Sequence, residues 1–175
     1  FLKDGDNIRS AVLVPASVKT KNASVTLTTD YPFNNKLRYD VTAKKAFDLF
    51  VRIPNFVKKV TVNGEEKFAE NGWLKLSVIG DTSFGIEFTY SPSFEKRPNG
   101  AYALNYGNLT LTLPIKEKAV MKEYTKDGVE RKFPYCDYEF LPTTDWQYAF
   151  NMVNFDDTVT TQNPTLQVKF NPNYS

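Results

Sequence analysis

The chain has 175 residues, and its 22 Lys and Arg nearly balance its 20 Asp and Glu, leaving a formal net charge of +2. A net charge of +2 is far from the strongly basic charge of a typical nucleic-acid-binding protein. The absence of His excludes catalysis and metal ligation by histidine. The single Cys excludes a disulfide within the chain and a metal site of several cysteines, so we predict no cofactor and no metal.

Apolar and polar residues alternate with a period of two in eight runs along the chain, which indicates half-buried β-strands. β-branched and aromatic residues occupy the apolar positions, as the pleated surface of a sheet prefers. In chain order, the alternating runs cover residues 25–29, 37–41, 47–53, 84–90, 109–113, 138–140, 146–150 and 166–170. No run has helical spacing over ten residues or the ~18 apolar residues of a membrane helix. We therefore predict an all-β protein with no membrane partner.

Turn residues separate these runs. The pair Asn63-Gly64 predicts a two-residue hairpin, because both positions of such a turn need positive φ. Gly80-Asp81 indicates another turn, and Pro54 ends an alternating run. Short strands with turn signals about every 8–12 residues are typical of a β-sandwich or barrel.

These elements predict an antiparallel, jelly-roll-like β-sandwich over residues 1–97. A second β-rich unit, truncated at its C-terminal end, is predicted over residues 98–175. The boundary is placed in the polar, proline-bearing stretch 91–100, which shows no alternation. One compact domain over the whole chain is the alternative.

Acidic residues and the lone cysteine are the candidates for catalysis. Asp137 and Glu139 lie two positions apart on a predicted strand and share a face, so they could form the carboxylate pair of a glycosidase. The other acidic candidates are Glu65-Glu66, Glu87 and Asp156-Asp157. Such groups normally form a solvated surface, and Cys136 has no His to activate it. We therefore predict a packed, inert thiol and no catalytic residue.

Aromatic side chains could form a sugar-binding face, since the apolar C–H face of a sugar stacks on Trp and Tyr. Four residues are the candidates for such platforms: Trp73, Trp146, Tyr31 and Tyr106. The competing interpretation is that these rings fill the core of a sandwich, as large aromatic side chains commonly do.

Several segments, taken in order, resemble a known family. They are Thr29-Asp30-Tyr31-Pro32-Phe33, FDLFVRIPNF at 47–56, Val60-Thr61-Val62-Asn63-Gly64, Asn71-Gly72-Trp73-Leu74-Lys75-Leu76, Gly80-Asp81 and YALNYGNL at 102–109. Together they resemble the non-catalytic β-rich region of β-L-arabinofuranosidase-like proteins, which are glycoside hydrolase family 127 and its uncharacterised relatives. Two departures from the family pattern, Ser77-Val78-Ile79 and Gly107-Asn108-Leu109, indicate a divergent member.

The resemblance implies an accessory, non-catalytic β-sandwich region that scaffolds a separate catalytic (α/α)6 barrel of the same parent chain. In the family that barrel holds a zinc-bound cysteine nucleophile and glutamates, and none of its motifs occurs here, so no catalytic or metal residue is carried over. A contribution to sugar binding stays open, and the alternative is a free-standing carbohydrate-binding or surface-adhesion module. The compartment stays undetermined, with a secreted or periplasmic location favoured.

On this interpretation the matched residues have structural roles. Arg52 is expected to brace a neighbouring carboxylate or carbonyls, because its planar guanidinium suits bidentate pairing. Pro54 ends its strand, and Asn63 and Gly64 close the hairpin.

Overall fold

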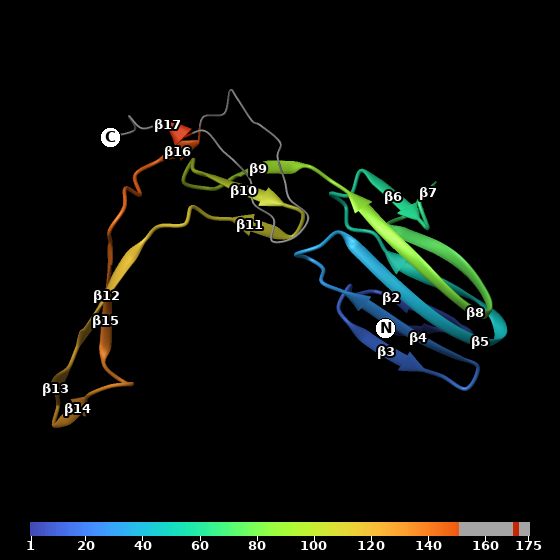
Figure 1. Cartoon of the computed structure of the whole chain (residues 1–175), viewed down its shortest axis with the longest axis horizontal. Coiled ribbons are helices and arrows are strands. Elements are labelled where there is room, and N and C mark those ends of the chain that lie inside the picture. Colours follow the sequence, from blue (N-terminus) through green and yellow to red (C-terminus); the bar gives the residue numbers. More distant parts are fainter. Residues whose placement is uncertain (151–169, 172–175) are drawn as a thin grey trace. The chain divides into compact units, whose positions relative to one another are not determined.

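The structure of the chain, a computed structural model, describes residues 1–150 and 170–171. Within these residues every regular element is a β-strand and there is no helix, as Figure 1 shows, which confirms the all-β prediction. The described residues accordingly contain no helix that could cross a membrane. They form two compact units, residues 1–111 and residues 112–150 with 170–171.

The strands of the first unit are β1 (Leu2–Asp4), β2 (Asn7–Ser10), β3 (Ala16–Lys19), β4 (Ala23–Thr29), β5 (Lys36–Arg52), β6 (Lys59–Val62), β7 (Glu65–Lys67), β8 (Trp73–Thr89), β9 (Pro92–Lys96), β10 (Tyr102–Tyr106) and β11 (Leu109–Leu111). The described strands of the second unit are β12 (Glu117–Lys122), β13 (Tyr124–Lys126), β14 (Val129–Arg131), β15 (Asp137–Pro142), β16 (Ala149–Phe150) and β17 (Phe170–Asn171).

One eight-stranded sheet forms most of the first unit. Its strand order is β1-β2-β5-β8-β6-β7, and β4, with β3 beside it, also pairs with β5. The long strands β5 and β8 run antiparallel to each other at its centre. On the side of β5 opposite β8, the two halves of the strand pair with different partners. Residues 37–43 pair with β4, whereas residues 49–51 pair in parallel with β2.

The sheet folds back on itself, so that the two halves of β5 lie in opposite layers around one core. Tyr39 is in the first half of β5, and Ser10 pairs with Val51 in the second half. The hydroxyl oxygens of Tyr39 and Ser10 nevertheless share a hydrogen bond of 2.7 Å, and both side chains are almost fully buried. The first unit is therefore a sandwich built mainly from one folded sheet, while its jelly-roll connectivity stays a prediction.

Inward-facing apolar side chains fill the space between the two layers. They alternate with exposed residues along β4, β5, β6 and β8, as half-buried strands require. The core includes Val25, Leu27, Leu37, Val41, Leu49, Val51, Val60, Val62, Leu74, Leu76, Ile86 and Phe88.

A bulge interrupts the ladder between β5 and β8. Ala43 pairs with Gly80 and Phe47 pairs with Val78, so the three residues 44–46 of β5 face a single residue of β8. All three are exposed, whereas the flanking Ala43 and Phe47 are buried. The extra residues therefore project from the sheet and bend β5 locally, as bulges do.

The turn predicted at Gly80-Asp81 is wrong. Both residues lie within β8, where they pair with Ala43 and Thr42 of β5. Gly80 has a φ of 69°, which glycine adopts at no steric cost. β8 therefore passes through this position without leaving the sheet.

A three-stranded antiparallel sheet, in the order β11-β10-β9, completes the first unit. β9 pairs with β10 across the boundary predicted after Arg97, and the compact units divide after Leu111. Tyr106 of β10 packs on Tyr90 with 4.7 Å between ring centroids, and Tyr90 packs edge-on against Phe56 at 5.2 Å. The predicted division into two domains stays a prediction.

The described part of the second unit consists of antiparallel two-stranded ribbons. β12 pairs with β15, β13 with β14, and β16 with β17. Among residues 112–148, all but Leu113, Val120 and Cys136 are exposed. This stretch of the chain therefore has no hydrophobic core of its own.

Asn63 and Gly64 close the β6–β7 hairpin as predicted, with φ values of 51° and 86°. The Asn63 side chain makes a contact that was not predicted. Its Oδ1 accepts a hydrogen bond of 2.7 Å from the backbone N–H of Gly85, which ties the turn to β8.

We expect Asn63→Ala to lower the free energy of unfolding by about 2 kcal/mol. About half of this loss comes from the left-handed backbone, which Ala tolerates less well than Asn, and half from the lost hydrogen bond. Asn71→Ala is the matched control, because Asn71 has a φ of 52° and no side-chain hydrogen bond within the described residues. Urea denaturation of both variants measures the difference, and equal losses would contradict the role given to Oδ1.

Candidate functional site

The four aromatic residues predicted as sugar platforms lie in three different surroundings. Tyr31 and Tyr106 belong to the ring cluster around Tyr90. Trp73 begins β8, and Trp146 belongs to the second unit. Their assignment to sugar binding stays a prediction, and each surrounding favours a different role.

Tyr31 and Tyr106 are packed within the first unit. Tyr106 is 8% exposed, and the edge of Tyr31 meets the ring of Phe88 with 6.3 Å between centroids. Asn108 Nδ2 donates a hydrogen bond of 2.7 Å to the Tyr31 hydroxyl. Burial raises the pKa of Tyr31 and of Tyr106, so both phenols stay protonated at neutral pH. This environment favours a packing role for the pair.

Trp73 lies against two guanidinium groups. The Cζ atoms of Arg9 and Arg52 are 5.0 and 5.6 Å from its ring centroid, within the range of a cation–π interaction. Arg52 was expected to brace a carboxylate or carbonyls, but its observed partner among the described residues is this indole ring. The physical reason is register: Arg52 and Trp73 are direct partners across β5 and β8, so their side chains share a face.

The side chain of Trp146 is accessible to solvent, with 54% of the residue's surface exposed. It lines a shallow hollow of about 570 Å³ formed by residues 142–148. Thr144, Asp145 and Gln147 supply a hydroxyl, a carboxylate and an amide beside the indole. An exposed aromatic face next to hydrogen-bonding groups is the type of surface on which a sugar ring can stack.

One face of the β12–β15 ribbon is apolar and exposed. Met121 pairs with Tyr138 and Ala119 with Phe140, and directly opposite residues share a face of the ribbon. Met121, Tyr138 and Phe140 are 48%, 41% and 58% exposed. The two aromatic rings are nearly parallel, at 25° with 6.4 Å between centroids. We call these four residues the apolar ribbon face.

The opposite face of the ribbon is charged. Glu139 forms an ion pair with Lys122 at 2.7 Å between Oε2 and Nζ. Asp137 accepts a hydrogen bond from Tyr124, and this bond raises the pKa of Tyr124. Asp137 and Glu139 thus share a face as predicted, but each is engaged with a neighbouring side chain rather than facing an enclosed cleft.

The remaining carboxylate candidates in the described part of the chain also have basic neighbours. Glu65 and Glu66 each form an ion pair of 3.0 Å, with Lys67 and Lys59 respectively. Glu87 lies 4.0 Å from Lys36, and Asp156-Asp157 lies outside the described residues. No group of three or more His, Cys, Asp or Glu that could hold a metal ion occurs within the described residues.

Cys136 is buried, with 9% of its surface exposed, as a packed thiol requires. Burial and a hydrogen bond with Cys136 raise the pKa of the Tyr138 hydroxyl. Cys136 therefore interacts with Tyr138 just before β15 begins, and its chemical inertness stays a prediction.

The apolar ribbon face was not predicted from the sequence. Alternation at 138–140 indicated a strand, but it did not show which residues lie opposite. Residues 119–121 pair with residues 138–140, and the β13–β14 hairpin lies between them in the chain. No local sequence pattern specifies which residues of the two strands become partners. The exposure of β12 and β15 also could not be predicted, because it depends on which parts of the folded chain cover them.

Residues 7–91 match the family model described as β-L-arabinofuranosidase, GH127 middle domain. A crystal structure of a GH127 β-L-arabinofuranosidase from Geobacillus stearothermophilus T6 matches with a TM-score of 0.51 and 16% identity, over 96% of this chain and 31% of that chain. A glycoside hydrolase matches at 0.41 and 16% identity, over 84% of this chain and 28% of that chain. A GH127 β-arabinofuranosidase matches at 0.44 and 15% identity, over 89% and 30%. No curated protein matches the chain significantly.

The chain spans less than a third of the length of these solved structures. At 16% identity, the likeness to the Geobacillus enzyme shows a shared fold. The family model covers the large sheet of the first unit from β2 to the end of β8. The resemblance drawn from the motifs is thus confirmed: residues 7–91 match the model of GH127 β-L-arabinofuranosidase middle domains.

Proposed function

We propose that the chain is an accessory, non-catalytic region of a GH127-type glycoside hydrolase that packs on a separate catalytic domain of the same polypeptide. The apolar ribbon face is the proposed contact surface. The observation that carries this proposal is that the face is exposed in a stretch of chain without a hydrophobic core.

Stability arguments support a partner for this surface. A lone two-stranded ribbon is marginally stable in water, so β12 and β15 need further packing. About half of each Met121, Tyr138 and Phe140 side chain remains available for burial. Covering the three would contribute roughly 3 kcal/mol in total. The chain corresponds to 31% of the matched Geobacillus enzyme, a proportion that leaves ample length for a catalytic domain in a polypeptide of that size.

The chemistry of the described residues supports a non-catalytic role. A glycosidase needs an acid and a nucleophile or base with tuned pKa values in a site that restricts water. The candidate carboxylates are instead held in exposed ion pairs and hydrogen bonds, and Cys136 is buried beside Tyr138.

The test uses the polypeptide in which the chain is joined to its catalytic domain. We expect Tyr138→Ser combined with Phe140→Ser to lower the melting temperature by about 5 °C, because two docked aromatic rings are lost. Activity on an aryl arabinofuranoside should fall in parallel. Calorimetric scans and steady-state rates measure both effects.

Glu139→Gln is the matched control, because it changes the charged face of the same ribbon. It should leave melting temperature and rate within error of the parent. If the serine variants and the Gln variant behave alike, the apolar ribbon face is not a docking surface.

Trp146 supports a second candidate function, a carbohydrate-binding module. Calorimetric titration of this chain alone with arabinose-containing oligosaccharides distinguishes the two. Saturable heat that disappears in Trp146→Ala and persists in Trp73→Ala would favour the binding module, whereas no heat favours the accessory role.

A further inference from the structure

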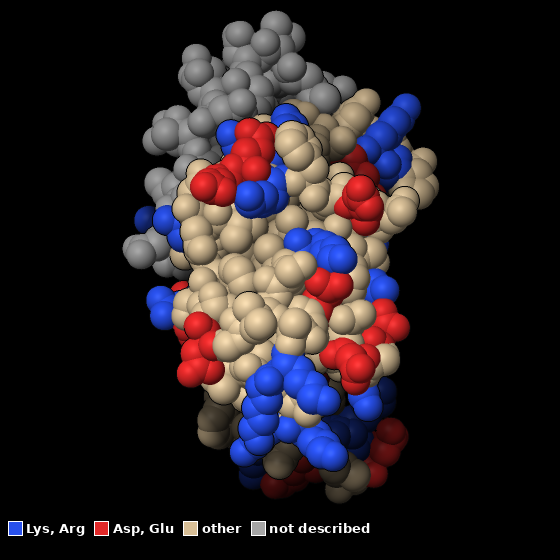
Figure 2. Space-filling model, turned by 90° about the vertical axis from the view of Figure 1, so that its right-hand side faces the viewer, with Lys and Arg blue, Asp and Glu red and all other residues tan. Residues whose placement is uncertain are grey.

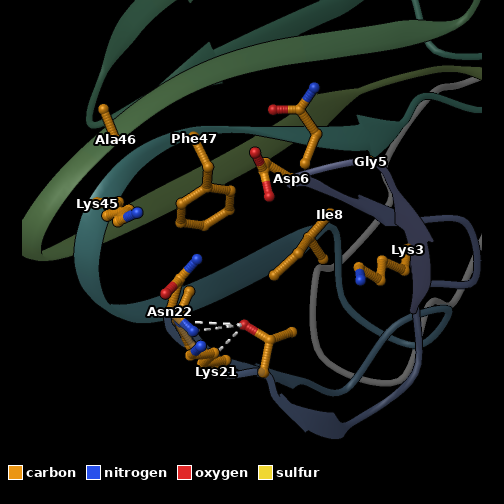
Figure 3. Close-up of a pocket in the computed structure, with 12 residues that line it drawn as sticks. Lys3, Gly5, Asp6, Ile8, Lys21, Asn22, Lys45, Ala46 and Phe47 are labelled. Atoms are coloured by element: carbon orange, nitrogen blue, oxygen red, sulfur yellow. Dashed lines mark hydrogen bonds between the residues drawn. The ribbon is translucent and has the colours of Figure 1, made fainter.

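A pocket of about 100 Å³ lies at one end of the first unit, where the β1–β2 turn, the β3–β4 turn and the bulge of β5 meet (Figure 3). Ile8 and Phe47, which are 3% and 8% exposed, give it an apolar wall. The hydroxyl of Thr20 accepts hydrogen bonds from the backbone N–H groups of Asn22, at 3.3 Å, and Ala23, at 3.0 Å. The β3–β4 turn is therefore held in one conformation at the rim.

Three lysines from three separate segments surround this wall. Lys3, Lys21 and Lys45 line the pocket, and Figure 3 shows Lys3 and Lys45 on opposite sides of it. Asp6 is the one carboxylate among the lining residues, so the lining has a net charge of +2 from three Lys and one Asp. This local charge equals the formal net charge of the whole chain.

None of these lysines has a carboxylate partner within the described residues. The ion pairs of the described residues are formed by other Lys and Arg side chains. Figure 2 shows a cluster of Lys and Arg side chains in the lower part of the displayed face. Like charges repel one another, and an anion bound among these lysines would reduce that repulsion.

The bulge of β5 places Lys45 at this pocket. An uninterrupted ladder would keep the alternation of β5 regular, and residue 45 would then point inward, as residues 43 and 47 do. The two extra residues release Lys45 and Ala46 from pairing and expose them at the rim. Bulges are enriched beside functional sites because they re-aim side chains in this way.

We propose that this pocket binds the oxyanion group of a small ligand, that is a carboxylate, sulfate or phosphate. Ammonium groups supply charge-assisted hydrogen bonds to such oxygens, and the Ile8–Phe47 wall accommodates the carbon atoms that carry the group. A volume of about 100 Å³ is well below that of pockets that enclose a drug-sized ligand, so it selects the charged end of a ligand and not a whole oligosaccharide. None of the lining residues belongs to the apolar ribbon face or to the hollow at Trp146, and the proposal does not depend on the proposed function.

Amide chemical shifts of the full chain can test the proposal. Sodium sulfate, sodium phosphate and sodium galacturonate are titrated separately at constant ionic strength set by NaCl, with neutral galactose as the uncharged probe. We expect saturable shifts at residues 20–23 and 44–47 with at least one of the three anions and none with galactose. The anion that saturates lowest identifies the ligand chemistry.

The variant Lys21→Gln with Lys45→Gln should weaken this binding about tenfold or more, since two charge-assisted contacts are lost. Lys96→Gln is the matched control: Lys96 is an exposed lysine of β9 that does not line the pocket and forms no ion pair within the described residues. Unchanged shifts outside the pocket show that each variant is folded. Shifts that do not saturate with any anion, or that weaken equally in the Lys96→Gln control, would overturn the proposal.

Discussion

The free energy of unfolding is expected to fall by about 2–3 kcal/mol between pH 10 and pH 12 because of one side chain, Tyr39. Burial raises the pKa of this phenol from 10.0 to about 12 in the folded protein. The unfolded chain loses the proton near pH 10, whereas the folded chain keeps it to about pH 12. The folded state therefore binds more protons in this window, and its stability decreases as the pH rises. Below pH 10 the contribution is fully present.

Tyr39→Phe isolates this effect. At neutral pH the variant should be about 1–2 kcal/mol less stable, because the buried hydroxyl of Ser10 loses its partner at 2.7 Å. From pH 10 to pH 12 its stability should fall less steeply than that of the parent. Tyr90 contributes to the remaining slope, since burial and then the neighbouring Tyr106 and Tyr31 raise its pKa to about 12.

Guanidinium denaturation at a series of pH values measures both slopes. Tyr135→Phe provides the control, because Tyr135 is 80% exposed. If Tyr39→Phe and Tyr135→Phe show the same slope as the parent, Tyr39 does not retain its proton through folding.

Gly107→Ala is expected to lower the free energy of unfolding by about 3–4 kcal/mol. Gly107 has a φ of 60°, where an L side chain costs about 1–2 kcal/mol. A Cβ atom there would also lie 2.9 Å from Cε2 of Tyr90 and 3.3 Å from Cε2 of Phe56. Tyr90 cannot move away freely, because its ring is packed between Phe56 and Tyr106. Forcing a methyl group into such a packed site costs a further 1–3 kcal/mol.

Gly5→Ala separates the two contributions. Gly5 has nearly the same φ, 61°, but a Cβ built on it has no atom within 4 Å. This variant should lose about 1–2 kcal/mol only, the backbone share. Chemical denaturation of both variants gives the comparison. A loss in Gly107→Ala no greater than in Gly5→Ala would mean that the ring cluster is loosely packed.

Local features of the fold were predictable from the sequence. The period-two alternation identified β4, both halves of β5 and the end of β8, and Asn63-Gly64 identified a hairpin, since both properties depend on neighbouring residues. The union of the runs at 37–41 and 47–53 into one strand was not predictable. It depends on β8, whose residues pair on both sides of the bulge and hold the two runs in line.

The candidate sites were less predictable because they depend on contacts between distant segments. The sequence singled out Tyr31 and Tyr106 separately, but only folding brings the Tyr31 hydroxyl to Asn108. Trp73 was predicted as a sugar platform, and its pairing with Arg52 follows from a strand register that no local pattern specifies. Lys3, Lys21 and Lys45 carry no sequence signal at all, since single lysines are common on any surface.

The size of the β5 bulge sets a rule for how this sequence can change in evolution. Ala43 and Phe47 both face inward because the bulge adds two residues, an even number, to a strand whose sides alternate. Loss or gain of a single residue between them would reverse every side chain from Phe47 to Arg52, exposing Leu49 and Val51 while burying Arg52. Insertions and deletions at this point should therefore survive in pairs. The length of this segment should therefore change only by an even number of residues, and aligned relatives should differ there by zero or two residues.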